Sequence, residues 1–163
     1  GLILSMRLFE NMLLNAYDEK PYAKSPLLED WAAARRDAQA KIADYSIAAT
    51  NESVVVGTLS GGNQQKVVVS KWLSISPRIL LLDEPTQGID VGAKADIYQL
   101  IDRLAREGMG VIVVSSDLIE IINLSNRIVV MRDGQAIKTL ESDELTEENV
   151  MLYAMGVNPD EKA

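Results

Sequence analysis

The chain reads LSGGNQQK at residues 59–66 and ILLLDE at residues 79–84. The first segment places a hydroxyl and two glycines where a loop enters an expected helix, with Ser60 as its cap. Unpaired backbone amides and the helix dipole attract anions at such a position. The second segment is a buried-type strand ending in adjacent carboxylates, where open α/β sheets present ligands. Together they predict an α/β protein that handles a nucleotide.

Each segment alone has a simpler interpretation. A serine before a glycine pair also marks an ordinary capped helix after a flexible turn. Asp83-Glu84-Pro85 also ends an ordinary strand. Their occurrence in this order favours the nucleotide interpretation. In it, Asp83 helps to hold Mg²⁺ through its waters, and Glu84 orients and polarises the attacking water.

Strands and helices are expected to alternate in the rest of the chain. Apolar runs typical of parallel strands covered on both faces occur at 79–82, 111–114 and 128–131. Helices are expected from Ser60 to Pro77, from Val91 to Glu107 with Gly108 as C-cap, and from Asp117 to Leu124. This order indicates a parallel sheet wrapped by helices.

The two ends of the chain have their own patterns. One helix is expected from Arg7 to about Asp18, ended by Lys20-Pro21, and a longer one from the cap Ser25-Pro26 to about Ala49. Past it, the β-branched run 54–56 ends at Gly57. Near the other end, a hairpin turn at 132–135 leads to a strand at 136–140 and an acidic-capped helix from Ser142 to about Gly156.

Composition excludes several kinds of chemistry. The net charge of -8, without any basic stripe, argues against nucleic-acid binding. The chain has no cysteine and no histidine, so disulfides, thiolates and imidazole bases are excluded. Its apolar runs are far shorter than the roughly 20 residues that span a bilayer. The chain begins at Gly1 without a signal peptide, and we expect it to be an excised piece.

A third segment, Thr86-Gln87-Gly88-Ile89-Asp90, follows the carboxylates. In this order and spacing the three segments resemble the signature, Walker B and D-loop sequences of ABC ATPases, and the match runs from Leu59 to about Gly134. The resemblance implies a partial P-loop NTPase fold, with a helical subdomain beside the sheet, and ATP and Mg²⁺ as cofactors. We expect one truncated nucleotide-binding domain over 1–163, divided at about 5–58, 59–140 and 141–163.

Within that superfamily the chain is similar to the monosaccharide importers of the ribose, xylose and galactose type. The similarity lies in NQQK at 63–66, Trp72-Leu73 and DEPTQGIDVGAK at 83–94. Phe9-Glu10-Asn11-Met12 and the helices up to Ala49 resemble the subdomain that docks on the membrane permease. The resemblance implies sugar import at the cytoplasmic face of the cell membrane, although the sequence does not name the sugar.

The resemblance also implies a role for each matching residue. The signature acts in trans, with Ser60, Gly61 and Gly62 contacting the γ-phosphate of ATP held by a partner nucleotide-binding domain. Asp90 communicates across the same interface, and Glu84 is the expected catalytic residue, with Asp83 beside it as the metal-binding residue. The full set of implied nucleotide-binding positions is Ser60, Gly61, Gly62, Asn63, Gln64, Asp90 and Ser116.

Two departures from the family pattern matter. No segment reads GxxxxGKS/T, the Walker A loop that cradles phosphates. We expect that loop before Gly1, and we expect these residues alone to hydrolyse ATP negligibly. Ser116 stands where ABC ATPases usually carry a switch histidine, and this serine is typical of the second cassette of tandem sugar importers. It leaves the hydrolytic competence of this site open.

The expected partners are a second cassette, the membrane permease and, indirectly, a sugar-binding protein. Two alternatives stay open at this point. A chromosome or DNA-repair ATPase shares these motifs but inserts long coiled coils, and no sustained heptad run occurs here. A non-catalytic regulatory or interaction module could keep the fold after losing its phosphate loop. The sequence upstream of Gly1 would discriminate between these possibilities.

Overall fold

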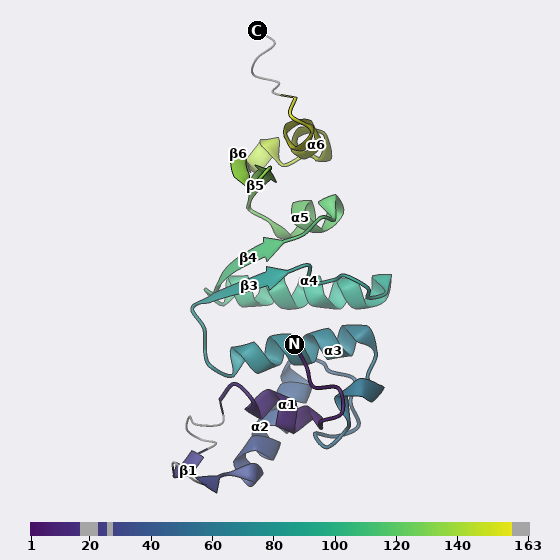
Figure 1. Ribbon diagram of the computed structural model, residues 1–163, viewed down its shortest axis with the longest axis vertical. Coiled ribbons are helices and arrows are strands. Elements are labelled where there is room, and N and C mark those ends of the chain that lie inside the picture. The colour runs from purple at the N-terminus through teal and green to yellow at the C-terminus, as the bar shows by residue number, and fades with distance from the viewer. Residues whose placement is uncertain (17–22, 26–27, 158–163) are drawn as a thin grey trace. The chain divides into compact units, whose positions relative to one another are not determined.

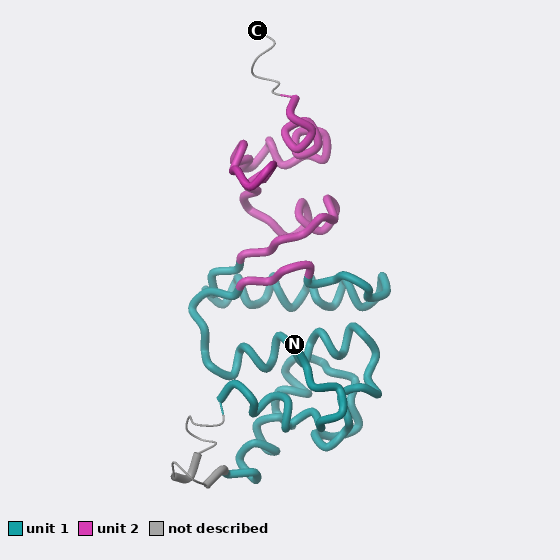
Figure 2. The backbone as a smooth tube through the Cα atoms, in the orientation of Figure 1, with its two compact units in different colours: residues 1–80, 85–111 teal, residues 81–84, 112–163 magenta. Residues whose placement is uncertain are grey.

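The computed structural model describes residues 1–16, 23–25 and 28–157 (Figure 1). The chain forms two compact units (Figure 2). Unit 1 comprises residues 1–80 and 85–111, and unit 2 comprises residues 81–84 and 112–163. Among the described residues, no helix combines the length and the hydropathy that a bilayer crossing requires.

Three helices of unit 1 pack around one apolar cluster. Helix α1 spans Leu8–Leu13, α2 spans Trp31–Asp44 and α3 spans Gly61–Leu73. The short strands β1 (Ala23–Ser25) and β2 (Leu28–Glu29) precede α2, and the 3-10 turn η1 (Val56–Thr58) precedes α3. The buried members of the cluster include Leu8, Phe9, Met12, Ala34, Ala38, Ile47, Val56 and Val67. The expectation of a helical first part is therefore confirmed.

The bounds of the first two helices were predicted wrongly. Helix α1 ends at Leu13, where Ala16 N donates to Leu13 O at 2.9 Å in a turn, and the predicted endpoint at Asp18 and stop at Lys20-Pro21 lie outside the described residues. The predicted cap Ser25 lies in β1, and Pro26 is outside the described residues. Helix α2 is capped by Asp30 instead, whose carboxylate accepts from Ala33 N at 3.0 Å.

Helix α2 also ends earlier than its composition suggests. Ser46 has a left-handed backbone with φ of 49°, while Ser46 N donates to Ala43 O at 3.2 Å and Ile47 N donates to Ile42 O at 2.9 Å. This is a Schellman termination, in which glycine is usual at the left-handed position. The predicted continuation to Ala49 is wrong, because the left-handed residue that ends the helix is Ser46 and not a glycine that the sequence would reveal.

The sheet that leads to the carboxylates consists of β3 (Ile79–Asp83) and β4 (Gly110–Val114). Gly110 N donates to Arg78 O at 3.1 Å and Glu84 N donates to Val114 O at 2.8 Å, so the strands run parallel, as predicted. Their predicted burial on both faces is wrong for the described residues. Leu80 and Leu82 are buried, whereas Leu81 is 64% exposed, because side chains alternate between two faces and only one is covered.

Helix α4 spans Val91–Arg106, so the predicted bounds and the predicted apolar face of this helix are confirmed. Asp90 caps it by accepting from Ala93 N at 3.0 Å, and Gly108, with φ of 95°, follows its end. Met109 N donates to Leu104 O at 3.1 Å, which completes the helix termination. The buried residues on its apolar face are Ile97, Leu100, Ile101 and Leu104.

Unit 2 continues with α5 (Leu118–Leu124), β5 (Arg127–Arg132) and β6 (Gln135–Glu141). The predicted hairpin is confirmed, since Arg132 pairs with Gln135 and the intervening Asp133 and Gly134 have φ of 50° and 75°. β5 was expected as a third parallel strand, but in the described sheets it pairs only with β6, antiparallel. The two-residue turn supplies a neighbour locally, without a crossover.

The chain then passes through the 3-10 turn η2 (Ser142–Glu144) into α6 (Glu147–Met155). Thr146 caps this helix by accepting from Asn149 N at 3.2 Å, and Gly156 ends it with φ of 84°. The predicted helix from Ser142 is therefore divided in two. The apolar side of α6 contributes Val150 and Tyr153 to a core that also contains Ile128, Val130 and Leu140.

Candidate functional site

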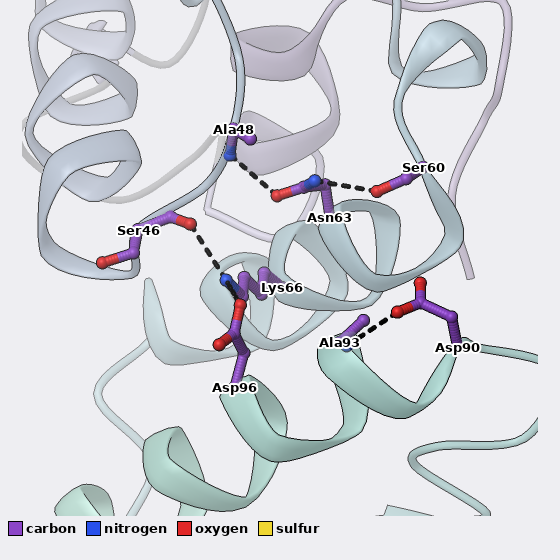
Figure 3. Close-up of polar contacts among 8 residues, drawn as sticks. All are labelled: Ser46, Ala48, Ser60, Asn63, Lys66, Asp90, Ala93 and Asp96. Atoms are coloured by element: carbon purple, nitrogen blue, oxygen red, sulfur yellow. Dashed lines mark hydrogen bonds and ion pairs between the residues drawn. The ribbon is translucent and has the colours of Figure 1, made fainter.

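The first candidate surface is the N-terminus of α3, which begins at Gly61 as predicted. Ser60 holds the N-cap position with an extended backbone, but its side chain accepts no backbone N–H of the helix. Its Oγ instead accepts from Asn63 Nδ2 at 2.8 Å (Figure 3). Ser60 and Gly61 are exposed. The first amides of α3 are therefore left without a side-chain cap, which is the arrangement that attracts an anion.

The two amide side chains that follow are used within the chain. Asn63 Oδ1 accepts from Ala48 N at 2.7 Å, and Gln64 Nε2 donates to Leu59 O at 2.9 Å. These contacts tie the first turn of α3 to the chain on both sides of it.

The glycine pair packs against the segment that starts α4. A Cβ on Gly61 would lie 3.3 Å from Ile89 Cγ2, and a Cβ on Gly62 would lie 2.4 Å from Ala93 Cβ. Gly62 thus marks a close approach of two helices, and a methyl group there would clash. Asp90, on the same stretch, is exposed apart from its cap bond to Ala93 N (Figure 3). The structure therefore brings the predicted signature and D-loop residues together.

A second link between α3 and α4 was missed by sequence reasoning. Lys66 Nζ lies 2.8 Å from Asp96 Oδ2 and 3.0 Å from Ser46 O, and the Lys66 side chain is only 7% exposed (Figure 3). Lys66 follows Gly62 by one helical turn, so both face α4. The four-residue spacing between Gly62 and Lys66 was the signal that could have predicted this contact. The segment at 59–66 includes Lys66, but no role was predicted for it.

The segment at residues 45–48 lies beside this link. Burial raises the pKa of the Tyr45 hydroxyl, and the Arg103 guanidinium lies 5.4 Å from the centre of the Tyr45 ring. Arg103 also donates to Asp44 O at 2.9 Å. The segment is therefore held by α4 through Arg103 and by α3 through Asn63 and Lys66.

We expect Asp96→Asn to lower the free energy of unfolding by about 1 kcal/mol, because the nearly buried Lys66 ammonium loses its counter-charge. Urea unfolding of the purified protein measures this. Asp102→Asn is the matched control, since Asp102 Oδ2 also lies 2.8 Å from a cation, Arg106 Nε, but both side chains are mostly exposed. Equal effects of the two substitutions would contradict a structural role for Lys66–Asp96.

The second candidate surface is the end of β3 in unit 2. Glu84 is half-buried with φ of 46°, a left-handed backbone that is unusual for a residue with a side chain. Its Oε1 accepts from Ser116 N at 2.9 Å, and its own N donates to Val114 O at 2.8 Å. The strand thus turns sharply at its end and presents the carboxylate beside the end of β4. The Ser116 contact uses the backbone, so it does not depend on a switch histidine.

Asp83 ends β3 and is exposed. Over residues 1–16, 23–25 and 28–157, no three acidic, histidine or cysteine side chains gather where they could hold a metal ion. A lone exposed carboxylate can supply one ligand to a metal ion whose other ligands come from elsewhere. This fits Mg²⁺, which usually keeps several waters and takes its other ligands from phosphates.

The predicted site residues fall into two groups. Unit 1 holds Ser60, Gly61, Gly62, Asn63, Gln64 and Asp90, and unit 2 holds Asp83, Glu84 and Ser116. Cavities of about 570 and 360 Å³ in unit 1 are lined by none of them. The candidate surface on α3 is the exposed helix tip at Ser60 and Gly61.

The chain resembles proteins of known sequence over most of its length. Residues 2–87 match the sequence model described as ABC transporter. Over 156 residues the chain is 44% identical to the ribose import ATP-binding protein RbsA of Lactococcus lactis, covering 96% of this chain and 31% of that protein. Over 110 residues it is 53% identical to RbsA of Halalkalibacterium halodurans, covering 68% and 22%. The chain thus spans about a third or less of the length of these curated relatives.

Solved structures with the same fold are ATP-binding cassettes. The dimeric post-hydrolysis structure of the cassette MJ0796, bound to ADP and Pi, has a TM-score of 0.70 at 26% identity and covers 86% of this chain and 59% of that chain. A nucleotide-free cassette from an ABC transporter has a TM-score of 0.74 at 20% identity, covering 96% and 61%. The α/β fold predicted from the sequence is therefore confirmed as a partial cassette fold.

Proposed function

Because this chain belongs to the ABC transporter family, we propose that it forms part of the ATP-binding, ATP-hydrolysing subunit of a monosaccharide importer. The similarity to ribose import proteins over nearly the whole chain supports ribose as the first sugar to test. The nucleotide-binding domain would be larger than these 163 residues, with 5–58 as its helical subdomain, 59–140 as the motif-bearing part and 141–163 as its C-terminal part. The Walker A loop would be supplied by the rest of the subunit.

One observation carries this proposal, namely the uncapped N-terminus of α3 at Ser60-Gly61-Gly62. Small residues leave the first backbone amides open, and the helix dipole favours an anion there. We assign this tip to the terminal phosphate of ATP held by a partner cassette. Asn63 and Gln64 complete the first turn, and Asp90 lies on the segment that packs against it.

The residues of unit 2 would serve the ATP bound within the same cassette. Bound MgATP supplies the phosphoryl group that is transferred to water. Asp83 would help to hold Mg²⁺, and Glu84 would accept the proton of the attacking water and orient it. The backbone N–H of Ser116 fixes one oxygen of Glu84 and leaves the other for this task. The proposed partners of the subunit are a second cassette, the membrane permease and, indirectly, a sugar-binding protein, at the cytoplasmic face of the membrane.

The proposal is tested by reconstituting the full-length protein with its permease in liposomes. We expect MgATP hydrolysis and ATP-dependent uptake of radiolabelled ribose, with sugar-binding protein present on the delivery side. Xylose and galactose serve as comparison sugars. ATP hydrolysis that depends on DNA, without uptake of any sugar, would support the chromosome or DNA-repair alternative. A full-length protein without any ATP binding would support the interaction-module alternative.

A further inference from the structure

The strongest unassigned feature of unit 1 is the amide of Asn63, which forms a hydrogen bond at each end (Figure 3). The backbone N–H of Ala48 can only donate, so the atom 2.7 Å from it must be the carbonyl oxygen of the amide. The NH₂ end therefore faces Ser60 Oγ at 2.8 Å and donates to it. The chemistry of the Ala48 contact alone fixes this orientation.

This orientation determines what the Ser60 hydroxyl can do. A serine hydroxyl has one hydrogen to donate and two lone pairs. One lone pair accepts from Asn63, while the side chain caps no backbone N–H of α3. Its hydrogen is therefore available to an acceptor outside the helix. A phosphate oxygen is such an acceptor, whereas a cation is not.

Ser60 would behave differently without Asn63. A serine at the N-cap normally turns its oxygen onto the second or third amide of the helix, which satisfies that amide. Asn63 is itself the third residue of α3, and its side chain reaches back to the serine. It thus keeps the hydroxyl off the backbone amides and keeps those amides open.

We propose that Asn63 is a positioning residue, which holds the Ser60 hydroxyl as a hydrogen-bond donor toward the terminal phosphate of ATP. This inference rests on the proposed function, in which Ser60 contacts that phosphate. It changes the expected role of Asn63 from a direct nucleotide contact to an action through Ser60. The anchor is Ala48 N, fifteen residues before Asn63 and on the segment that follows α2.

The test is a double-mutant cycle between Ser60→Ala and Asn63→Ala in the full-length protein. The ATP dissociation constant is measured by equilibrium titration, and KM and kcat are measured separately. We expect each single variant to raise the dissociation constant about tenfold, since each removes the same charge-assisted hydrogen bond. The double variant should bind no more weakly than Ser60→Ala alone. The rise should appear in KM more than in kcat.

Lys66→Met is the matched control, because it removes the other bond from α3 to the segment at 45–48, together with the ion pair to Asp96, and leaves Ser60 and Asn63 untouched. Its effect should add to that of Ser60→Ala. Additive effects of Asn63→Ala and Ser60→Ala would show that Asn63 only supports the fold, and would overturn the inference alone. If Ser60→Ala leaves ATP affinity unchanged, the proposed phosphate role of Ser60 is wrong, and the inference fails with it.

Discussion

Glu84→Gln lowers kcat for ATP hydrolysis by the full-length protein about 100- to 10 000-fold, which is the usual contribution of a general base. The amide cannot accept a proton from water, but it keeps an oxygen to accept from Ser116 N and has nearly the same size. ATP affinity should therefore stay within about twofold of the original. Phosphate release at saturating MgATP measures kcat, and nucleotide titration measures affinity.

Glu107→Gln supplies the control for this change. Glu107 is an exposed carboxylate that follows α4. It lines a cavity with Ile79, which starts β3, whereas Glu84 follows the last residue of that strand, so the replacement of Glu107 makes the same chemical change at the opposite end of β3. We expect normal hydrolysis from that variant and normal thermal unfolding from both. A Glu84→Gln protein that keeps more than half of the original rate would show that another group activates the water.

The backbone at Glu84 supports its assignment independently of sequence. A left-handed conformation costs a residue with a side chain roughly 1–3 kcal/mol, and such strain persists where the surroundings enforce it. Here Glu84 N donates to Val114 O, and the Glu84 carboxylate accepts from Ser116 N. Hydrogen bonds therefore hold both the backbone and the side chain of this residue. The conformation itself could not be predicted, because Asp83-Glu84-Pro85 has no glycine or asparagine to signal a left-handed residue.

Local patterns predicted those parts of the fold that depend on neighbouring residues. The spacing of Ile97, Leu100, Ile101 and Leu104 predicted α4, and Asp133-Gly134 predicted the hairpin between β5 and β6. The neighbour of β5 could not be predicted in the same way. An apolar run such as 128–131 is compatible with a parallel neighbour or with a hairpin. The turn at Asp133-Gly134 places β6 beside β5, so the hairpin forms.

For the candidate site, the sequence predicted which residues lie at the start of α3 but not which hydrogen bonds their side chains form. The octet at 59–66 predicted a helix beginning at Gly61, and this is confirmed. It also predicted Ser60 as the cap, and Ser60 has that position, but its hydroxyl bonds to Asn63 instead. The anchor of Asn63 is a backbone N–H at Ala48, and a backbone group leaves no signal in sequence.

Gly62→Ala should lower the free energy of unfolding of the protein by about 2 kcal/mol, in the range for overpacking a close contact. The added Cβ would lie 2.4 Å from Ala93 Cβ, so α3 and α4 must move apart. Gly61→Ala is the natural comparison, because its Cβ would lie 3.3 Å from Ile89 Cγ2 and 3.9 Å from Gly88 O, which are both longer than the 2.4 Å contact at Gly62. We expect a smaller loss there, measured by urea unfolding under identical conditions.

A methyl exchange tests whether this contact is the cause. In Gly62→Ala combined with Ala93→Gly, the methyl group moves from α4 to α3, and the nearest remaining atom of residue 93 is its Cα at 3.6 Å, an ordinary contact. Ala93→Gly costs some helix propensity by itself, up to about 1 kcal/mol. The double variant should nevertheless be more stable than Gly62→Ala alone. A double variant that shows the sum of both losses would mean that the loss in Gly62→Ala does not come from the contact with the methyl group of residue 93.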